Sequence, residues 1–364
     1  MNGRSKAIDA LRGIAALSVV IYHSREINWV GLSSIWQKHG LSADLNALLG
    51  YASAPFSFGF VAVPLFFVIS GYCIHRPNVI RLQGDPDHSL NLGEYCKRRL
   101  WRVYPVLIAA LFLTLLLDSY TRAHTPEDYR LGDNSWQSFV LNLLTLQNIA
   151  CPPYGSNGPL WTLGMELHFY FLYPLLFHST KKVGAAKTVT SVFFISVVCI
   201  AWLKITGSQA TVFPTYWFTW ATGFLIAECD AGRCAFRLPK PLLASILLTA
   251  VGCGLCLKNE RHLAEPFFAV GFGAFVWWSL RPGNRTLWES PLGRMAAIMG
   301  IFSYSLYAIH LPFLVFLKSS LQGGAKSESI AVPLVFSLLS ILLAAAMFWA
   351  VERWSLRLPG KSTR

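Results

Sequence analysis

A succession of long apolar runs constrains this chain more than any other feature. Several of them approach the roughly 20 residues that a helix needs to cross the ~30 Å hydrocarbon core of a membrane. Backbone N–H and C=O groups in hydrocarbon must be satisfied within the chain, so these runs must form helices. Apolar residues make up 54% of the 364 residues and charged residues only 13%, which excludes an ordinary water-soluble fold. The sequence therefore predicts an all-α, polytopic transmembrane helix bundle.

The apolar pattern predicts about ten membrane crossings. The predicted spans are 8–27, 56–75, 101–118, 160–178, 188–204, 212–228, 242–257, 265–280, 295–317 and 329–350. The segment 136–149 is apolar but too short to cross, so we expect an interfacial or re-entrant piece there. We expect residues 1–364 to form a single integral-membrane domain with no appended extracytoplasmic domain.

The distribution of charge predicts the orientation of the chain. The 31 Lys and Arg residues outnumber the 18 Asp and Glu residues. An even number of crossings with a cytoplasmic N-terminus places most of the basic residues in cytoplasmic loops, as the positive-inside rule requires. Both termini are therefore predicted to be cytoplasmic, and the basic charge needs no nucleic-acid partner.

The eight cysteines lie mostly in predicted cytoplasmic or intramembrane segments, so we expect no disulfide framework. Cys253 and Cys256 have a C-x-x-C spacing but lack a second pair of ligands, so we expect no metal site.

Ionisable residues within membrane helices are costly and usually face a cavity or one another. In the first predicted helix Asp9, Arg12 and His23 share a face, with His23 about 16 Å from Arg12 toward the outer side. This stripe makes His23 a candidate general base. The alternative is that Asp9 and Arg12 pair to anchor the helix while His23 bonds a neighbouring backbone group.

A second group lies in the predicted span 160–178. Glu166 is the only acid expected deep within a span, and it shares a helix face with Thr162, Tyr170 and Tyr173. Its expected depth resembles that of His23, so the two side chains are expected to be able to meet. The alternative is a carboxylate that only clamps two helices together.

A third group lies in SYSLYAIHLPF, where Ser303, Tyr307 and His310 line one helix face. His310 competes with His23 for the role of base. Packing or orientation of a substrate is the alternative role.

A fourth group is predicted to be cytoplasmic. Arg99 and Arg102 in KRRLWRVYP lie near the inner end of the first helix and Arg12, and arginine forks match phosphate geometry. This region can hold a phosphorylated donor such as coenzyme A, although positive-inside residues need no ligand. Ser70 and Gly71 allow a ligand or another backbone to approach the inner end of the second helix, which small-residue helix packing explains equally well.

Together these segments resemble the membrane acyltransferase-3 family, the bacterial O-acetylases of surface and secreted polysaccharides. The matching segments are DALRGIAALSVVIYH, PLFFVISGY, RRLWRVYP, the NLLTLQNI and GPLWTLGMELHFYFLYP block, SYSLYAIHLP and VERW. The Arg, ten residues, His pattern of the family falls on Arg12 and His23. Its Arg-x-x-Arg pair falls on Arg99 and Arg102, and its Trp-to-Glu helix on Trp161 and Glu166.

The resemblance implies an enzyme of the bacterial inner membrane that carries an acetyl group from cytoplasmic acetyl-CoA to a hydroxyl of an extracytoplasmic or lipid-linked glycan. His23, Glu166 and His310 are then the expected catalytic residues. The expected donor contacts are Arg12, Arg99, Arg102 and Ser70, and the expected substrate contacts are Asp9, Trp161, Tyr170 and Tyr307.

The chain departs from the family pattern at two places. Pro64 replaces an acidic residue that many members carry, and the hydrolase-like domain of some members is not expected here, so transfer should finish in the membrane domain or through a partner. Two other functions remain open: a transporter or flippase of a lipid-linked saccharide, which inverted repeats would favour, and a structural subunit, which would tolerate alanine at His23.

Overall fold

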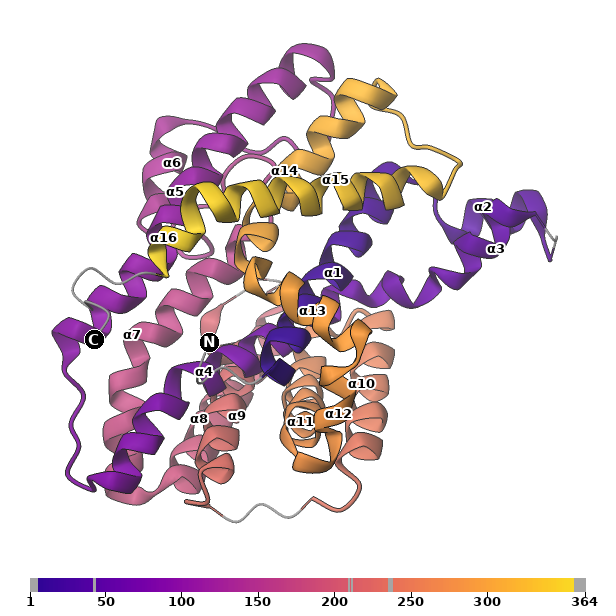
Figure 1. Cartoon of the computed structure of the whole chain (residues 1–364). Helices are drawn as coiled ribbons and strands as arrows, with labels where there is room; N and C mark the ends of the chain where they lie inside the picture. The colour runs from indigo at the N-terminus through magenta and orange to yellow at the C-terminus, as the bar shows by residue number, and fades with distance from the viewer. Residues whose placement is uncertain (1–5, 42–43, 209, 211, 235–237, 357–364) are drawn as a thin grey trace. The chain divides into compact units, whose positions relative to one another are not determined.

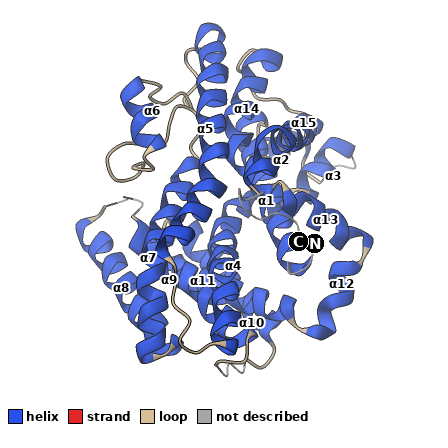
Figure 2. Ribbon diagram, turned by 60° about the vertical axis from the view of Figure 1, so that its left-hand side comes forward, coloured by secondary structure: helices blue, strands red, loops and turns tan. Residues whose placement is uncertain are grey.

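A computed structural model describes residues 6–41, 44–208, 210, 212–234 and 238–356 of the chain. Within these ranges the regular structure is helical, and no strand occurs apart from isolated bridges. Figure 2 shows the helices and the loops that join them. The prediction of an all-α protein with several membrane helices is therefore confirmed.

Contacts divide the chain into two compact units that alternate along the sequence. The first unit comprises Met1–Arg12, Val61–Tyr95 and Met165–Ile298, and the second comprises Gly13–Phe60, Cys96–Gly164 and Met299–Arg364. The division passes through α1 (Lys6–Asn28), α5 (Leu92–His124), α7 (Leu160–Val183) and α13 (Pro291–Ile301).

The first unit is built around α9 (Phe213–Asp230). This helix packs against α4 (Ala62–Gly84), α8 (Ala185–Thr206) and α11 (Arg261–Leu280), and α11 packs against α10 (Pro241–Leu257) (Figure 1). Short turns η2 (Pro282–Asn284) and α12 (Arg285–Glu289) follow α11. Because α9 has neighbours on several sides, Trp220 and Phe224 in its middle are fully buried.

Two glycines let α4 and α9 approach closely. A Cβ atom on Gly71 would meet the carbonyl oxygen of Trp220, and a Cβ atom on Gly223 would meet the carbonyl oxygen of Val68. Both obstacles are backbone atoms, so no rotamer change can make room for a larger side chain. The structure thus shows a second backbone approaching at Gly71, one of the two roles expected for this position.

The second unit contains most of α1 and α5 together with α14 (Ser303–Gln322) and α15 (Ala331–Met347), which pack on each other. The core between α1, α14 and α15 includes Ile27, Leu311, Leu314, Val315, Leu317 and Phe336. The remaining elements of this unit are α2 (Leu32–His39), α3 (Leu45–Ala52), η1 (Ala54–Val61), α6 (Trp136–Leu143), the π-helical turn η3 (Phe348–Glu352) and α16 (Arg353–Ser355).

A proline inside α14 is compensated by a side chain from another segment. Pro312 has no N–H, so the carbonyl oxygen of Ala308 loses its partner within the helix. The amide of Asn157 donates to that oxygen at 2.8 Å and to the Thr114 hydroxyl oxygen at 3.0 Å. Asn157 therefore ties α14 to α5 while it satisfies a backbone group.

The expected number of crossings is not confirmed. In the described residues six helical stretches are long and apolar enough to cross a membrane, or seven if the bent pair Pro291–Ile301 and Ser303–Gln322 counts as one span. α10 has only 17 residues. α7 and α9 are not among the candidates because Tyr, Trp, His and Glu side chains lower their mean hydropathy.

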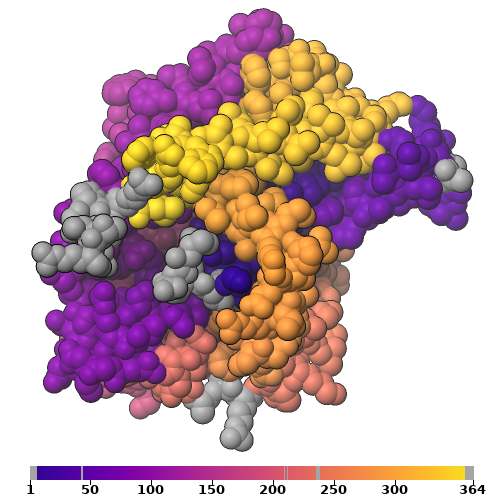
Figure 3. Space-filling model, in the orientation of Figure 1, coloured from indigo at the N-terminus to yellow at the C-terminus, as the bar shows by residue number. Residues whose placement is uncertain are grey.

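One face of α15 is apolar and exposed. Leu334, Val335, Leu338 and Leu342 are between 42% and 57% exposed. Figure 3 shows α15, in yellow, at the surface of the molecule. In a protein that spans a membrane, such a stripe faces lipid, so its exposure needs no protein partner.

We predict that Gly223→Ala destabilises the protein, because the new Cβ collides with the Val68 carbonyl oxygen. Overpacking of this kind costs about 1–3 kcal/mol. Gly254→Ala is the matched control, since this α10 glycine has nothing within 4 Å of an added Cβ and alanine is the better helix former. Thermal unfolding in detergent should show a lower midpoint for Gly223→Ala only. Equal midpoints for the two variants would contradict the packing argument.

Candidate functional site

The predicted site residues fall into both units. In the second unit lie His23, Arg99, Arg102, Trp161, Tyr307 and His310. In the first unit lie Asp9, Arg12, Ser70, Glu166 and Tyr170. The expected meeting of Glu166 with His23 joins residues of different units and stays a prediction.

The two candidate bases of the second unit lie side by side. The imidazole rings of His23, on α1, and His310, on α14, have centroids 5.2 Å apart and planes tilted by 35°. His310 is fully buried and His23 half-buried. The two residues expected to compete for one role are thus neighbours.

The hydrogen bonds of His310 define its tautomer. Its Nδ1 lies 3.1 Å from the carbonyl oxygen of Leu306 and 2.9 Å from that of Tyr307. Carbonyl oxygens only accept, so Nδ1 carries the proton and Nε2 holds a lone pair while the ring is neutral. Nε2 of His310 and Nδ1 of His23 are both buried without a hydrogen-bond partner among the described residues. Two unpartnered ring nitrogens therefore belong to adjacent rings.

Residues around this pair are held by the start of α7. The Thr162 hydroxyl lies 2.9 Å from the Tyr307 hydroxyl, and Tyr307 also contacts the His310 ring with centroids 5.7 Å apart. The Asn148 amide donates to the carbonyl oxygen of Trp161 at 3.0 Å. Tyr307 and Trp161, two expected substrate contacts, are thus fixed by hydrogen bonds to or near the first turn of α7.

The loop between α5 and α7 is anchored on α1 and α14, the helices that carry His23 and His310. Arg130 pairs with Glu26, which lies one turn beyond His23 on α1, and Lys318 on α14 pairs with Asp128 at 2.9 Å. Lys318 and Asp128 have side chains only 7% and 2% exposed, so this pair is well shielded from water. The loop is therefore held beside the helices that carry His23 and His310.

Further hydrogen bonds shape the same loop. The Ser135 backbone N–H and hydroxyl donate to Asp133, each at 2.9 Å, and hold the pKa of that carboxyl below its ordinary value. Buried Asp118 accepts from the Ser156 N–H at 2.8 Å and from the Asn134 amide at 3.1 Å.

Glu166 is bonded to hydroxyl groups in the first unit. Its Oε1 accepts from the Ser70 hydroxyl on α4 at 2.8 Å and from the Tyr170 hydroxyl one turn along α7. Ser70, expected to contact the donor, thus has a carboxylate partner. Asp9 is buried and Arg12 half-buried in the same unit.

Arg102 is engaged in an ion pair that sequence reasoning missed. Its Nη2 lies 2.6 Å from Oε1 of Glu352, a carboxylate with 0% exposure in the π-helical turn η3. Oε2 of Glu352 accepts from the backbone N–H of Ser305 at 3.0 Å and from its hydroxyl at 2.5 Å. Ser305 lies in the first turn of α14, where backbone N–H groups lack helical partners. The sequence signal that could have revealed it is the acidic residue of the VERW segment, which is Glu352.

Nη1 of Arg102 remains buried without a hydrogen-bond partner among the described residues. Arg99, expected to act with Arg102, is half-buried.

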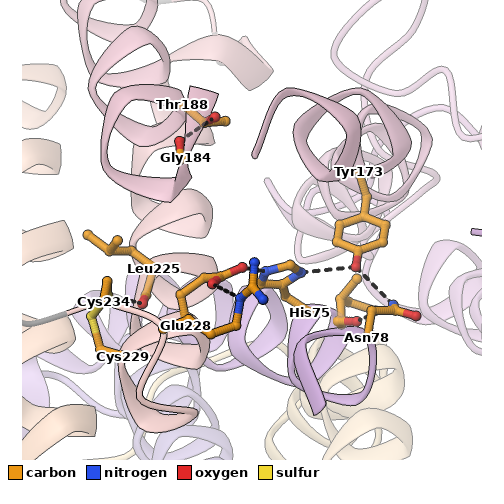
Figure 4. A network of polar contacts seen from close by, with 11 residues as sticks. His75, Asn78, Tyr173, Gly184, Thr188, Leu225, Glu228, Cys229 and Cys234 are labelled. Atoms are coloured by element: carbon orange, nitrogen blue, oxygen red, sulfur yellow. Dashed lines mark hydrogen bonds and ion pairs between the residues drawn. A yellow bond between two sulfur atoms is a disulfide. The ribbon is translucent and has the colours of Figure 1, made fainter. Parts of the chain in front are cut away.

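A second buried network lies in the first unit (Figure 4). The ring of His75, on α4, lies between Glu228, on α9, with Nε2 to Oε1 2.8 Å, and the Tyr173 hydroxyl, 3.0 Å from Nδ1. The Asn78 amide donates to the Tyr173 oxygen at 2.9 Å, and Arg233 Nε donates to Oε2 of Glu228 at 2.9 Å. The network joins α4, α7 and α9.

Sequence reasoning missed two further buried acids of the helices, because Glu228 is 2% exposed and Glu265, in α11, is 7% exposed. They lie at the ends of the predicted spans 212–228 and 265–280. One expectation is corrected here. Cys229 and Cys234 form a disulfide, whereas none was expected. The described residues contain no group of three or more His, Cys, Asp or Glu side chains placed to hold a metal ion.

Comparison with known proteins identifies the relatives of the chain. A family described as an acyltransferase domain matches residues 5–351. The O-acetyltransferase OatA of Staphylococcus aureus (strain NCTC 8325 / PS 47) is 26% identical over 374 residues, which cover 93% of this chain and 54% of OatA. BcsY of Komagataeibacter xylinus, named as a membrane-bound transacylase, is 24% identical over 371 residues, covering 94% of this chain and 82% of BcsY.

The peptidoglycan O-acetyltransferase OatA of Listeria monocytogenes is 25% identical over 176 residues, covering 46% of this chain and 23% of that protein. The chain thus spans about half the length of the staphylococcal relatives. No solved structure matches.

We predict that Glu352→Gln destabilises the protein, because Arg102 then keeps a neutral partner for a half-buried positive charge. Weakening a charged hydrogen bond of this kind should lower the free energy of unfolding by about 1–3 kcal/mol. Glu328→Gln is the matched control. It removes a carboxylate from the pair with Lys38, where both side chains are more than half exposed, so no measurable change is expected. Unfolding curves in detergent measure both variants, and an unchanged curve for Glu352→Gln would show that the Glu352–Arg102 ion pair does not stabilise the protein.

Proposed function

Because the chain belongs to the acyltransferase family that matches residues 5–351, we propose that it is a multi-pass membrane O-acetyltransferase. It transfers the acetyl group of acetyl-CoA to a hydroxyl of an extracytoplasmic or lipid-linked glycan. The O-acetyltransferase relatives support the reaction type, and the apolar helices support a membrane location. The observation that carries the chemistry is the pair of adjacent imidazoles, each with an unpartnered nitrogen.

His23 is the proposed general base. The acceptor oxygen attacks the thioester carbonyl carbon, a C–O bond forms and the C–S bond breaks. The hydroxyl proton passes to His23 and then to the departing thiolate, so the products are the acetyl ester and free coenzyme A. His310, with Nε2 as a fixed acceptor, can take a hydrogen bond from Nδ1–H of His23 and so direct the lone pair of the other His23 nitrogen at the acceptor.

The donor is proposed to bind from the cytoplasm with its phosphates at Arg99 and Arg102, assisted by Arg12. Guanidinium groups match phosphate oxygens in charge and geometry, and the unpartnered Nη1 of Arg102 supports this assignment. We further propose that the protein lies in the inner membrane of a bacterium with both termini in the cytoplasm, and the distribution of basic residues supports this orientation.

The acceptor is proposed to contact Asp9, Trp161, Tyr170 and Tyr307. Aromatic rings suit the apolar faces of sugars, and their hydroxyls suit the polar edges. Glu166 is proposed to assist the proton transfer.

We predict that His23→Ala inserts and folds but loses acetyl transfer by about 10²- to 10⁴-fold, because a general base contributes this much to the rate. The measurement is the incorporation of label from [¹⁴C]acetyl-CoA into the surface glycan extracted from cells that lack the gene. Mass spectrometry of surface glycans with and without the gene identifies the product.

His310→Ala is the comparison that assigns the base. A smaller loss than in His23→Ala is expected, since an orienting ring affects the rate through its neighbour. A near-normal rate in His23→Ala together with a large loss in His310→Ala would transfer the role of base to His310. Normal rates in both variants would refute the proposed function.

We predict that Arg99→Ala weakens binding of acetyl-CoA on the order of ten-fold, since a charge-assisted hydrogen bond to phosphate is lost. The affinity for dephospho-coenzyme A, which lacks the 3′-phosphate, should fall less than that for acetyl-CoA when Arg99 is replaced. Lys97→Ala removes an exposed charge from the same run and should leave donor binding unchanged. Isothermal titration on detergent-solubilised protein measures the affinities of wild type and of both variants. Equal acetyl-CoA affinities for wild type and Arg99→Ala would exclude this donor site.

A further inference from the structure

The hydrogen bonds at Glu166 continue to a residue that the sequence did not single out. Nε1 of Trp220, on α9, lies 3.2 Å from the hydroxyl oxygen of Ser70. An indole N–H only donates, so the Ser70 oxygen accepts this bond and its own proton is free for Oε1 of Glu166, 2.8 Å away. The bonds therefore run in one direction, from the indole through the hydroxyl to the carboxylate.

We propose that Trp220 is a positioning residue for Glu166 and acts through Ser70. This inference rests on the proposed function, in which Glu166 assists proton transfer. With Ser70 directed by Trp220, and with the Tyr170 hydroxyl also donating, Oε1 of Glu166 is held by two donors. Oε2 accepts no hydrogen bond within the described part of the chain and is the atom left for the reaction.

The close packing of α4 and α9 makes this contact possible. Gly71 follows Ser70 directly, and Gly223 lies one turn after Trp220. At both glycines an added Cβ would strike the backbone of the other helix, so the two helices touch at this level. Trp220 is consequently fully buried, and its indole has a fixed position above Ser70.

Comparison with a neighbouring tryptophan indicates that the hydrogen bond of Trp220 is not explained by burial of its indole N–H alone. Trp217 is one turn earlier on α9 and 7% exposed, yet its Nε1 has no partner among the described residues. The helix thus tolerates a buried indole N–H without a hydrogen bond. The partner of Trp220 is specific to Ser70 and, through it, to Glu166.

The test compares Trp220→Phe with Trp217→Phe. Both changes keep an aromatic ring and remove an indole N–H, but only the first removes a donor from Ser70. The first measurement is the infrared carboxylate band of Glu166, isolated as the difference between purified wild type and Glu166→Gln. This band should shift in Trp220→Phe and in Ser70→Ala and remain in place in Trp217→Phe. This infrared measurement requires neither acetyl-CoA nor the glycan acceptor.

The second measurement is turnover of acetyl-CoA with the unacetylated surface glycan from cells lacking the gene. Trp220→Phe should lower kcat about two- to ten-fold, the loss expected for one hydrogen bond, with KM for acetyl-CoA unchanged. In a Glu166→Gln background the same change should have no further effect, since the group that Trp220 positions is already altered.

An unmoved band in Trp220→Phe would overturn the inference, and so would an equal fall in kcat in the wild-type and Glu166→Gln backgrounds. Failure of the proposed function looks different. Wild-type protein would then transfer no acetyl group, while the infrared shift would still decide the role of Trp220.

Discussion

Hydrocarbon offers no hydrogen-bond partner to the backbone, and this constraint governs how the helices are held. Two prolines show it most clearly. Pro312 frees the Ala308 carbonyl, which accepts from Asn157, and Pro174 frees the Tyr170 carbonyl, which accepts from the Tyr95 hydroxyl at 3.0 Å. The two repairs lie on the helices that carry His310 and Glu166. Contacts that satisfy the backbone thus also hold the two helices on which these candidate site residues lie.

Buried charge obeys a similar requirement, because an unpaired ion in the membrane is expensive. Glu352 is fully buried, but Arg102 and the first turn of α14 supply three donors to it. Glu228 accepts a hydrogen bond from His75 and forms an ion pair with Arg233 in the first unit. Since each network joins several helices, breaking one bond disturbs packing as well as charge. This is why the predicted effect of a neutral glutamine at 352 is on stability, independently of the donor.

The sequence alone was enough for the helical membrane class, for the family and for the residues worth testing. Periodicity assigned His23 and His310 to helix faces but not to each other, because faces meet only in the folded chain. Glu352 was missed for the same reason, since its partner Arg102 is 250 residues away. The count of spans was less predictable, because polar and aromatic side chains that serve buried networks lower the hydropathy of α7 and α9.

The two imidazoles limit how many protons the pair can hold. At the 5.2 Å separation of their rings, two positive charges would repel by about 3 kcal/mol even at an effective dielectric constant of about 20. Double protonation is therefore disfavoured, so the pair can take up only one proton readily. Nδ1–H of His310 already donates hydrogen bonds to backbone carbonyls, so Nε2 of this ring is left as a hydrogen-bond acceptor. His23 has no such bond at Nδ1, so this nitrogen is available to donate to Nε2 of His310, and a bond of that kind leaves the lone pair of the proposed base on its other ring nitrogen.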